Sequence, residues 1–160
     1  MILGVGIDLC RIERIRRSVA RFGKAWLDEV FAEAEQEQLG PEPQLAEAAT
    51  IGFALKEAAA KAIGTGFANG VNRRDFRIEH GPMGPCVHLF GEAARRAAQL
   101  GPAHILTRIH AAARNVDGWV TAICFLTTRD VSAPDLLASL PDLLPCSSTQ
   151  LPRGQAQPNR

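Results

Sequence analysis

The sequence has no long apolar run: no stretch approaches the roughly 18 consecutive apolar residues of a membrane-spanning helix. The first ten residues also lack the basic start and apolar stretch of a secretory signal. We therefore expect a soluble, cytoplasmic protein that does not associate with a membrane.

The cysteines are few and scattered, and no two of them form a C-x-x-C pair. They are Cys10, Cys86, Cys124 and Cys146. Zinc knuckles and disulfide frameworks need closer and more regular spacing. We expect buried or incidental thiols in the reduced state.

Net charge is also small, at +1, but the charges are unevenly distributed. Residues 28–47 contain no Lys or Arg and are strongly acidic, whereas residues 11–24 are basic with a single acid, Glu13. The electric field of a basic segment followed by an acidic one affects the choice of binding partner more than the fold. A near-neutral domain with one basic stripe and no aromatic stacking residues beside it argues against a nucleic-acid-binding module.

Apolar periodicity divides the first part of the chain into a strand and helices. Alternation at Leu3, Val5, Ile7 and Leu9 predicts a strand with these residues on its buried face, and Asp8 on the other face. The period then becomes helical from residue 11 onward, with the arginines on the exposed side. A long alanine-rich helix is predicted over residues 45–63, ended by Gly64.

The second half of the chain reads as strands around one helix. Strands are expected at residues 75–80, 86–90, 104–110 and 119–126, a helix at 91–100, and a turn over 111–118. A length of 160 residues suits one domain, which we expect to span 1–128. Residues 129–160 are rich in Pro, Ser and Gln and are predicted to be a disordered tail.

Three elements are suited to binding a metal-phosphate ligand. Asp8 and Glu57 are carboxylates in otherwise apolar or small-residue elements, a set that suits Mg²⁺. Lys61 leads into Gly64, Thr65 and Gly66, whose glycines let an anion approach the backbone closely.

Each element also has a purely structural interpretation. Asp8 is equally suited to capping the helix that follows it. Glu57 and Lys61, four residues apart, suit an ordinary surface ion pair, and the glycines suit a helix stop.

Two segments in the same order resemble the holo-[acyl-carrier-protein] synthases. The first is GVGIDLCRIERI, and the second is FALKEAAAKAIGTG, which matches F-x-x-K-E-A-x-x-K-A-x-G-T-G. The resemblance implies an α+β fold, a small antiparallel sheet packed against a long helix, in a homotrimer with coenzyme A between subunits. It also implies transfer of 4′-phosphopantetheine from coenzyme A to a serine of apo-acyl carrier protein, releasing adenosine 3′,5′-bisphosphate.

The resemblance assigns roles to residues of both segments. Asp8 and Glu57 become ligands of Mg²⁺, and the coenzyme is bound by Lys61, Gly64, Thr65, Gly66 and, through a weaker match, His110. The base that accepts the serine proton is left open between Glu57, the first choice, and Glu35.

The basic helix is the expected contact with the acidic carrier protein. Its exposed stripe consists of Arg14, Arg17, Arg21 and Lys24, and the resemblance favours Arg14 and Arg21. The competing interpretation is a solvated helix face.

The sequence departs from the family pattern at several positions. Gly52 replaces an arginine expected next to the phosphate site, so that coenzyme binding is weaker or another cation substitutes; Ala32 replaces a threonine. The turn after His110 is longer than usual, and the tail has no counterpart. These departures keep open a non-catalytic paralogue that binds the carrier protein through residues 11–24.

Overall fold

The computed structural model describes residues 1–81, 84–103 and 105–128. They form a five-stranded antiparallel sheet with the strand order β1-β5-β4-β3-β2. The strands are β1 (Ile2–Arg11), β2 (Phe76–Gly81), β3 (Gly84–Leu89), β4 (Thr107–Val116) and β5 (Trp119–Thr128). The α+β class and the antiparallel sheet are confirmed, whereas the predicted tail, 129–160, lies outside the described residues.

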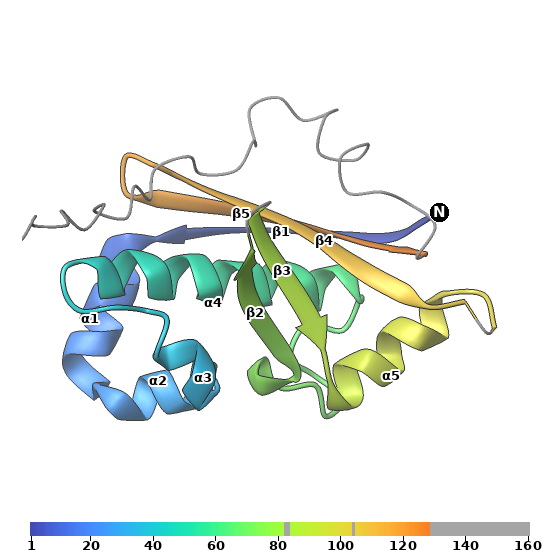
Figure 1. Cartoon of the computed structure of the whole chain (residues 1–160), viewed down its shortest axis with the longest axis horizontal. Coiled ribbons are helices and arrows are strands. Elements are labelled where there is room, and N and C mark those ends of the chain that lie inside the picture. Colours follow the sequence, from blue (N-terminus) through green and yellow to red (C-terminus); the bar gives the residue numbers. More distant parts are fainter. Residues whose placement is uncertain (82–83, 104, 129–160) are drawn as a thin grey trace, which may run out of the picture.

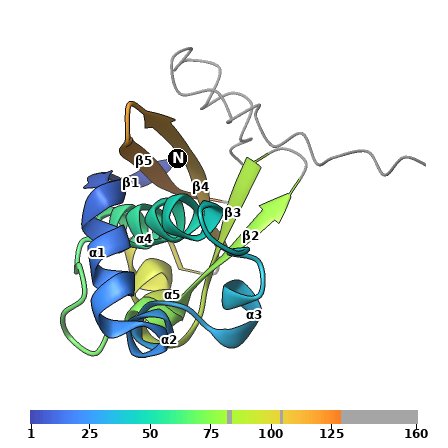
Figure 2. The same cartoon turned by 90° about the vertical axis from the view of Figure 1, so that its left-hand side faces the viewer.

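A long helix, α4 (Gln44–Ala62), crosses one face of β1, β5 and β4, and the other helices lie at its two ends (Figure 1). In Figure 2 the helices labelled α1, α2 and α3 gather around the N-terminal end of α4, whereas α5 lies toward its C-terminal end in Figure 1. These helices are α1 (Ile12–Phe22), α2 (Lys24–Val30), α3 (Glu33–Gln36) and α5 (Gly91–Leu100), and a short 3-10 helix, η1 (Arg73–Asp75), precedes β2.

Helix α4 approaches β1 so closely at Gly4 and Gly6 that these two positions have no room for side chains. A Cβ atom at Gly4 would stand 2.0 Å from the carbonyl oxygen of Ala62, and one at Gly6 would stand 1.9 Å from that of Ala58. Only glycine fits such a backbone contact. The facing turns of α4 carry alanines, so two small-residue surfaces meet and the core needs few large side chains here.

The predicted orientation of β1 is wrong. Its glycines and Asp8 face α4, whereas Val5, Ile7 and Leu9 lie on the other face of the sheet and are 48%, 56% and 57% exposed. A period of two shows that a strand has two different faces, but it does not show which face meets the helix. The backbone contact with α4 decides this, because it excludes side chains larger than glycine at positions 4 and 6.

The predicted turn over 111–118 is also wrong. Residues 111–116 continue β4, with Ala111 opposite Cys124 and Ala113 opposite Ala122 of β5. The turn is only Asp117 and Gly118, both at positive φ. Alanine has a low strand propensity by itself, but burial between neighbouring strands and α4 outweighs that preference. His110 therefore lies within a strand and not before a long turn.

None of the helices within the described ranges is both long enough and apolar enough to cross a membrane.

Candidate active site

The carboxylate of Asp8 lies beside Lys61, where β1 passes under α4. Lys61 Nζ donates to Asp8 Oδ1 at 2.8 Å and to the carbonyl oxygen of Ile7 at 2.9 Å. Asp8 stands within β1, and the residue before α1 is Arg11, so Asp8 is not the cap of that helix. Asp8 Oδ2 has no hydrogen-bond partner within the described part of the chain.

Glu57 is paired with a cation that the sequence did not indicate. Arg73 Nη2 in η1 donates to Glu57 Oε1 at 3.1 Å, while Lys61 turns to Asp8. The simple Glu57–Lys61 ion pair is therefore not formed. Glu57 Oε2, like Asp8 Oδ2, accepts no hydrogen bond from residues 1–81, 84–103 or 105–128.

Cys10 shows that the two carboxylates share one neighbourhood. Burial raises the pKa of its thiol, the Arg14 guanidinium lowers it, and the charges of Asp8 and Glu57 raise it further. Both carboxylates therefore lie near Cys10. The thiol is buried and held in its protonated form, which makes it a poor metal ligand.

The two carboxylates fit a magnesium ion. Each has one oxygen paired with a cation and one without a partner among the described residues, and their side chains are 15% and 21% exposed. Mg²⁺ is usually held by one or two carboxylates, with water and substrate phosphates completing the octahedron. No group of three or more His, Cys, Asp or Glu side chains suited to a metal occurs in the described ranges, so a softer, fully protein-bound ion is not indicated there.

The loop after α4 is open toward solvent. Gly64 and Gly66 have φ values of 77° and 57°, which favour glycine. A Cβ at Gly66 would meet nothing within 4 Å, and one at Gly64 would meet only Arg96 at 3.9 Å. Thr65 Oγ1 donates to the carbonyl oxygen of Gly66. The loop both ends the helix and leaves room for a ligand along its backbone.

Glu35 is separated from this site by its own buried network. Its Oε2 accepts from Lys56 Nζ at 2.8 Å and from the amide of Ala32 at 2.8 Å, and its Oε1 accepts from the amide of Ile78 at 2.9 Å. Lys56 is fully buried and also donates to the carbonyl oxygen of Val30. Burial lowers the pKa of Lys56, and the hydrogen bond to Glu35 opposes this shift. Both oxygens of Glu35 are occupied, which argues against its second-choice role as the base.

His110 is buried in β4, where its Nε2 lies 3.0 Å from Thr127 Oγ1. It borders an open cavity of about 740 Å³ between β3, β4 and α5. Burial, with a smaller effect of Arg108, lowers the pKa of His110 and favours the neutral ring. Within the described residues, no hydrogen bond or ion pair joins it to Asp8 or Glu57, so its part in holding the nucleotide remains a prediction.

The basic stripe of α1 divides into paired and unpaired cations. Arg17 is bound to Glu13 at 3.0 Å, and Lys24 to Asp28 at 2.6 Å. Arg14 and Arg21 have no carboxylate partner among the described residues, and their guanidinium groups lie 5.6 Å from the ring of Phe53 and 5.0 Å from that of Phe22. They are the two residues of the stripe that retain an uncompensated charge.

Comparison with known proteins shows to which family the chain belongs. Residues 4–124 match the model of the 4′-phosphopantetheinyl transferase superfamily. The chain belongs to that family. Over 111 residues it is 42% identical to the holo-[acyl-carrier-protein] synthase of Brucella ovis, covering 69% of this chain and 83% of the relative.

Solved structures agree with this assignment. The crystal structure of the Neisseria meningitidis holo-[acyl-carrier-protein] synthase matches with a TM-score of 0.67 at 27% identity, covering 79% of this chain and 99% of that one. The Helicobacter pylori enzyme, solved in complex with coenzyme A, matches with a TM-score of 0.65 at 23% identity, covering 77% and 99%. This phosphopantetheinyl transferase is thus an enzyme with the fold of holo-[acyl-carrier-protein] synthases.

We predict that Glu35 stabilises the fold and does not accept the serine proton. Glu35→Ala leaves the buried Lys56 ammonium without its carboxylate and should lower the free energy of unfolding by about 3–5 kcal/mol. Urea unfolding followed by circular dichroism measures the change, and Glu33→Ala, an exposed acid on the same helix, is the matched control. A stable Glu35→Ala protein that cannot transfer the group would restore Glu35 as the base.

Proposed function

We propose that this enzyme transfers the 4′-phosphopantetheine group of coenzyme A to a serine of apo-acyl carrier protein with Mg²⁺ held by Asp8 and Glu57. The observation that carries the proposal is the pair of half-occupied carboxylates beside Lys61 and the open Gly64–Gly66 loop. When bound, Mg²⁺ would neutralise charge on the pyrophosphate. The family relationship supports the same reaction.

The bond changes define what the residues must do. The serine hydroxyl attacks the phosphorus that carries pantetheine, the bond from this phosphorus to the bridging oxygen breaks, and adenosine 3′,5′-bisphosphate leaves with the electron pair. Lys61, whose side chain is 48% exposed, is placed to contact the phosphates. Glu57 accepts the serine proton in this scheme on the lone pair of Oε2 that a bound ion would leave free, because Oε1 is held by Arg73. Positioning and charge supply the catalysis, without a covalent enzyme intermediate.

Transfer itself is the first test. Incubation with apo-carrier protein, coenzyme A and Mg²⁺ should add one phosphopantetheine group to the carrier, as measured by mass spectrometry. Asp8→Asn and Glu57→Gln should each slow this gain about 100-fold or more, since each removes a preorganised charge. A chelator should abolish it, and Glu37→Gln, an exposed acid on the surface, is the matched control.

Either contrary result decides against part of the proposal. A folded wild-type protein that modifies none of several carrier proteins would favour the non-catalytic paralogue that only binds the carrier. Full activity of Asp8→Asn with chelator present would remove the metal site.

We place the carrier protein on the exposed face of α1. Arg14 and Arg21 carry charge that no described carboxylate compensates, and Arg14 also adjoins the Asp8–Glu57 site through Cys10. A carrier bound there would bring its serine to the phosphates. Arg17 also lies on α1, and Lys24 begins α2, but the acidic partners of these two cations weaken their attraction to an acidic protein.

We predict that Arg21→Ala raises the KM for the carrier protein about threefold to tenfold, which corresponds to about 1 kcal/mol, and leaves kcat unchanged. Arg16→Ala, which removes a neighbouring charge already paired with Glu13 at 2.5 Å, should change the KM less than twofold. Steady-state kinetics at two salt concentrations measures both. Equal effects of the two variants would show that only the total charge of α1 matters.

We further propose that three copies assemble through the sheet face that β1 turns away from α4. Val5, Ile7 and Leu9 form an apolar row on β1, next to Phe125 and Ile123 of β5 in the strand register. A row of half-exposed aliphatic side chains is unusual on a soluble monomer and is typical of an interface.

Light scattering after size-exclusion chromatography should give the mass of three chains. Ile7→Glu should dissociate the assembly, because it places a charge in the apolar row. Phe90→Glu is the matched control, since Phe90 is similarly exposed at 43% but follows β3. A wild-type monomer at micromolar concentration would contradict the trimer.

The cytoplasm is the compartment that we propose. Cys10, Cys86 and Cys124 are all free thiols, as suits a reducing environment.

A further inference from the structure

Arg73 is held in one place by the 3-10 helix η1. The carboxylate of Asp75 accepts from the amide of Asn72 at 3.0 Å, and the carbonyl oxygen of Asp75 accepts from the amide of Phe90 at 2.7 Å. These bonds fix both ends of η1. The Arg73 guanidinium lies 4.4 Å from the ring centre of Phe67 and 5.6 Å from that of Phe53. Its position is therefore set before any ligand arrives.

The hydrogen-bonding capacity of Arg73 is mostly unused. A guanidinium has five N–H donors, and within the described residues only Nη2 makes a hydrogen bond, to Glu57. Nε is buried without a hydrogen-bond partner in the described part of the chain. Among the same residues, Nη1 forms an ion pair only with Glu29, at 3.8 Å, and that carboxylate is 71% exposed. Unused donors beside a phosphate site indicate an acceptor that is supplied by a ligand.

The site also lacks a cation at Gly52, where the family pattern has an arginine. A Cβ at Gly52 would stand 2.7 Å from Cε1 of Phe31, so this position is filled by the core and has no room for a longer side chain. Lys61 already uses two of its three ammonium donors on Asp8 and Ile7. Arg73, which lies in η1 and binds Glu57, adds a second cation beside the carboxylates Asp8 and Glu57.

We propose that Arg73 binds the pyrophosphate of coenzyme A through Nη1 while Nη2 keeps hold of Glu57. The inference rests on the proposed function. Nη1 and Nη2 lie on the same edge of the guanidinium, so that one can bind a phosphate oxygen while the other binds the carboxylate. An ammonium lacks this fixed pair of donors. The pyrophosphate is the acceptor, and not the 3′-phosphate, because Glu57 belongs to the centre where the phosphorus reacts.

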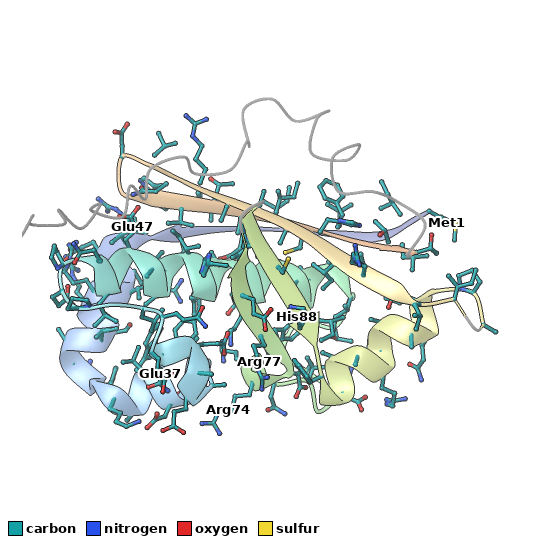
Figure 3. All side chains as sticks on the ribbon, in the orientation of Figure 1. Met1, Glu37, Glu47, Arg74, Arg77 and His88 are labelled. Atoms are coloured by element: carbon teal, nitrogen blue, oxygen red, sulfur yellow. The ribbon has the colours of Figure 1, made fainter. Side chains whose placement is uncertain are left out.

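Arg74 provides a matched control on the same short helix. Its Nε donates to the carbonyl oxygen of Asp28 at 3.0 Å, away from Glu57. In Figure 3 its side chain projects from the lower edge of the molecule. Arg74→Gln removes the same charge from η1 without changing the site.

The experiment is calorimetric titration of the full chain with coenzyme A in the presence of Mg²⁺. Arg73→Gln should raise the Kd at least tenfold, and Arg74→Gln should change it less than twofold. Arg73→Lys, which keeps the charge and the stem over Phe67, should raise the Kd about threefold or more because an ammonium lacks the fork. Wild-type affinity in Arg73→Gln, or in Arg73→Lys if the first variant does not fold, would overturn the proposal.

Two further titrations locate the contact. Arg73→Gln should raise the Kd for dephospho-coenzyme A, which lacks the 3′-phosphate, by the same factor as the Kd for coenzyme A. An increase confined to coenzyme A would overturn the assignment to the pyrophosphate. With chelator present, the loss should persist, and its disappearance would mean that Arg73 only positions Glu57. A wild-type protein that does not bind coenzyme A would refute the proposed function itself, whereas a binding and active wild type with an unchanged Arg73→Gln refutes only this inference.

Discussion

The contact between α4 and β1 is the constraint on which the site depends. Because Gly4 and Gly6 have no side chains, the backbones meet, and the turn of α4 that carries Lys61 comes within hydrogen-bonding distance of Asp8. Larger residues at those positions would separate the strand from the helix by the width of a side chain. Asp8 and Glu57, far apart in the sequence, would then no longer lie beside the same thiol.

A second constraint fixes the rotation of α4 about its axis. Lys56 and Glu57 are adjacent in the sequence, but their side chains point in different directions and have different partners. Lys56 is buried against Glu35 and the carbonyl oxygen of Val30, which ties α4 to α3 and to the end of α2, while Glu35 also accepts from β2. A buried pair of this kind is expensive to break, so it fixes which side of α4 faces inward. Glu57 consequently faces the site.

Sequence reasoning predicted correctly the regular elements that carry the candidate site residues. Asp8, Glu57 and Lys61 stand in a strand and a helix whose types were predicted correctly, and the glycine loop ends α4 as expected. It failed where long-range packing decides. The faces of β1 were exchanged because the pattern does not record the approach of α4, and β4 was predicted too short because alanine gives a weak strand signal.

Arg73 was missed, and the burial of Glu35 was not predicted, for a related reason. The side chain of Arg73 reaches Glu57 across sixteen positions of sequence, and nothing in the run NRRD distinguishes it from Arg74. Glu35 stands in an acidic stretch that suggests an exposed surface, yet it is buried because Lys56 meets it from α4. The one sequence signal for the Lys56–Glu35 contact is the lysine inside an alanine-rich helix, which needs an acidic partner if it is buried.

The charges of the site explain why each carboxylate has its own cation. Two acids, Asp8 and Glu57, face two bases, Lys61 and Arg73, so these four charges sum to zero. Without the bases, the two carboxylates would repel a pyrophosphate; without the acids, nothing would hold a divalent cation. If the pairs used all their oxygens, however, the charges would only neutralise one another. Within the described residues, each acid keeps one oxygen unpaired and Arg73 keeps donors unpaired, so the candidate site is neutral as a whole and still suits a cation and an anion together.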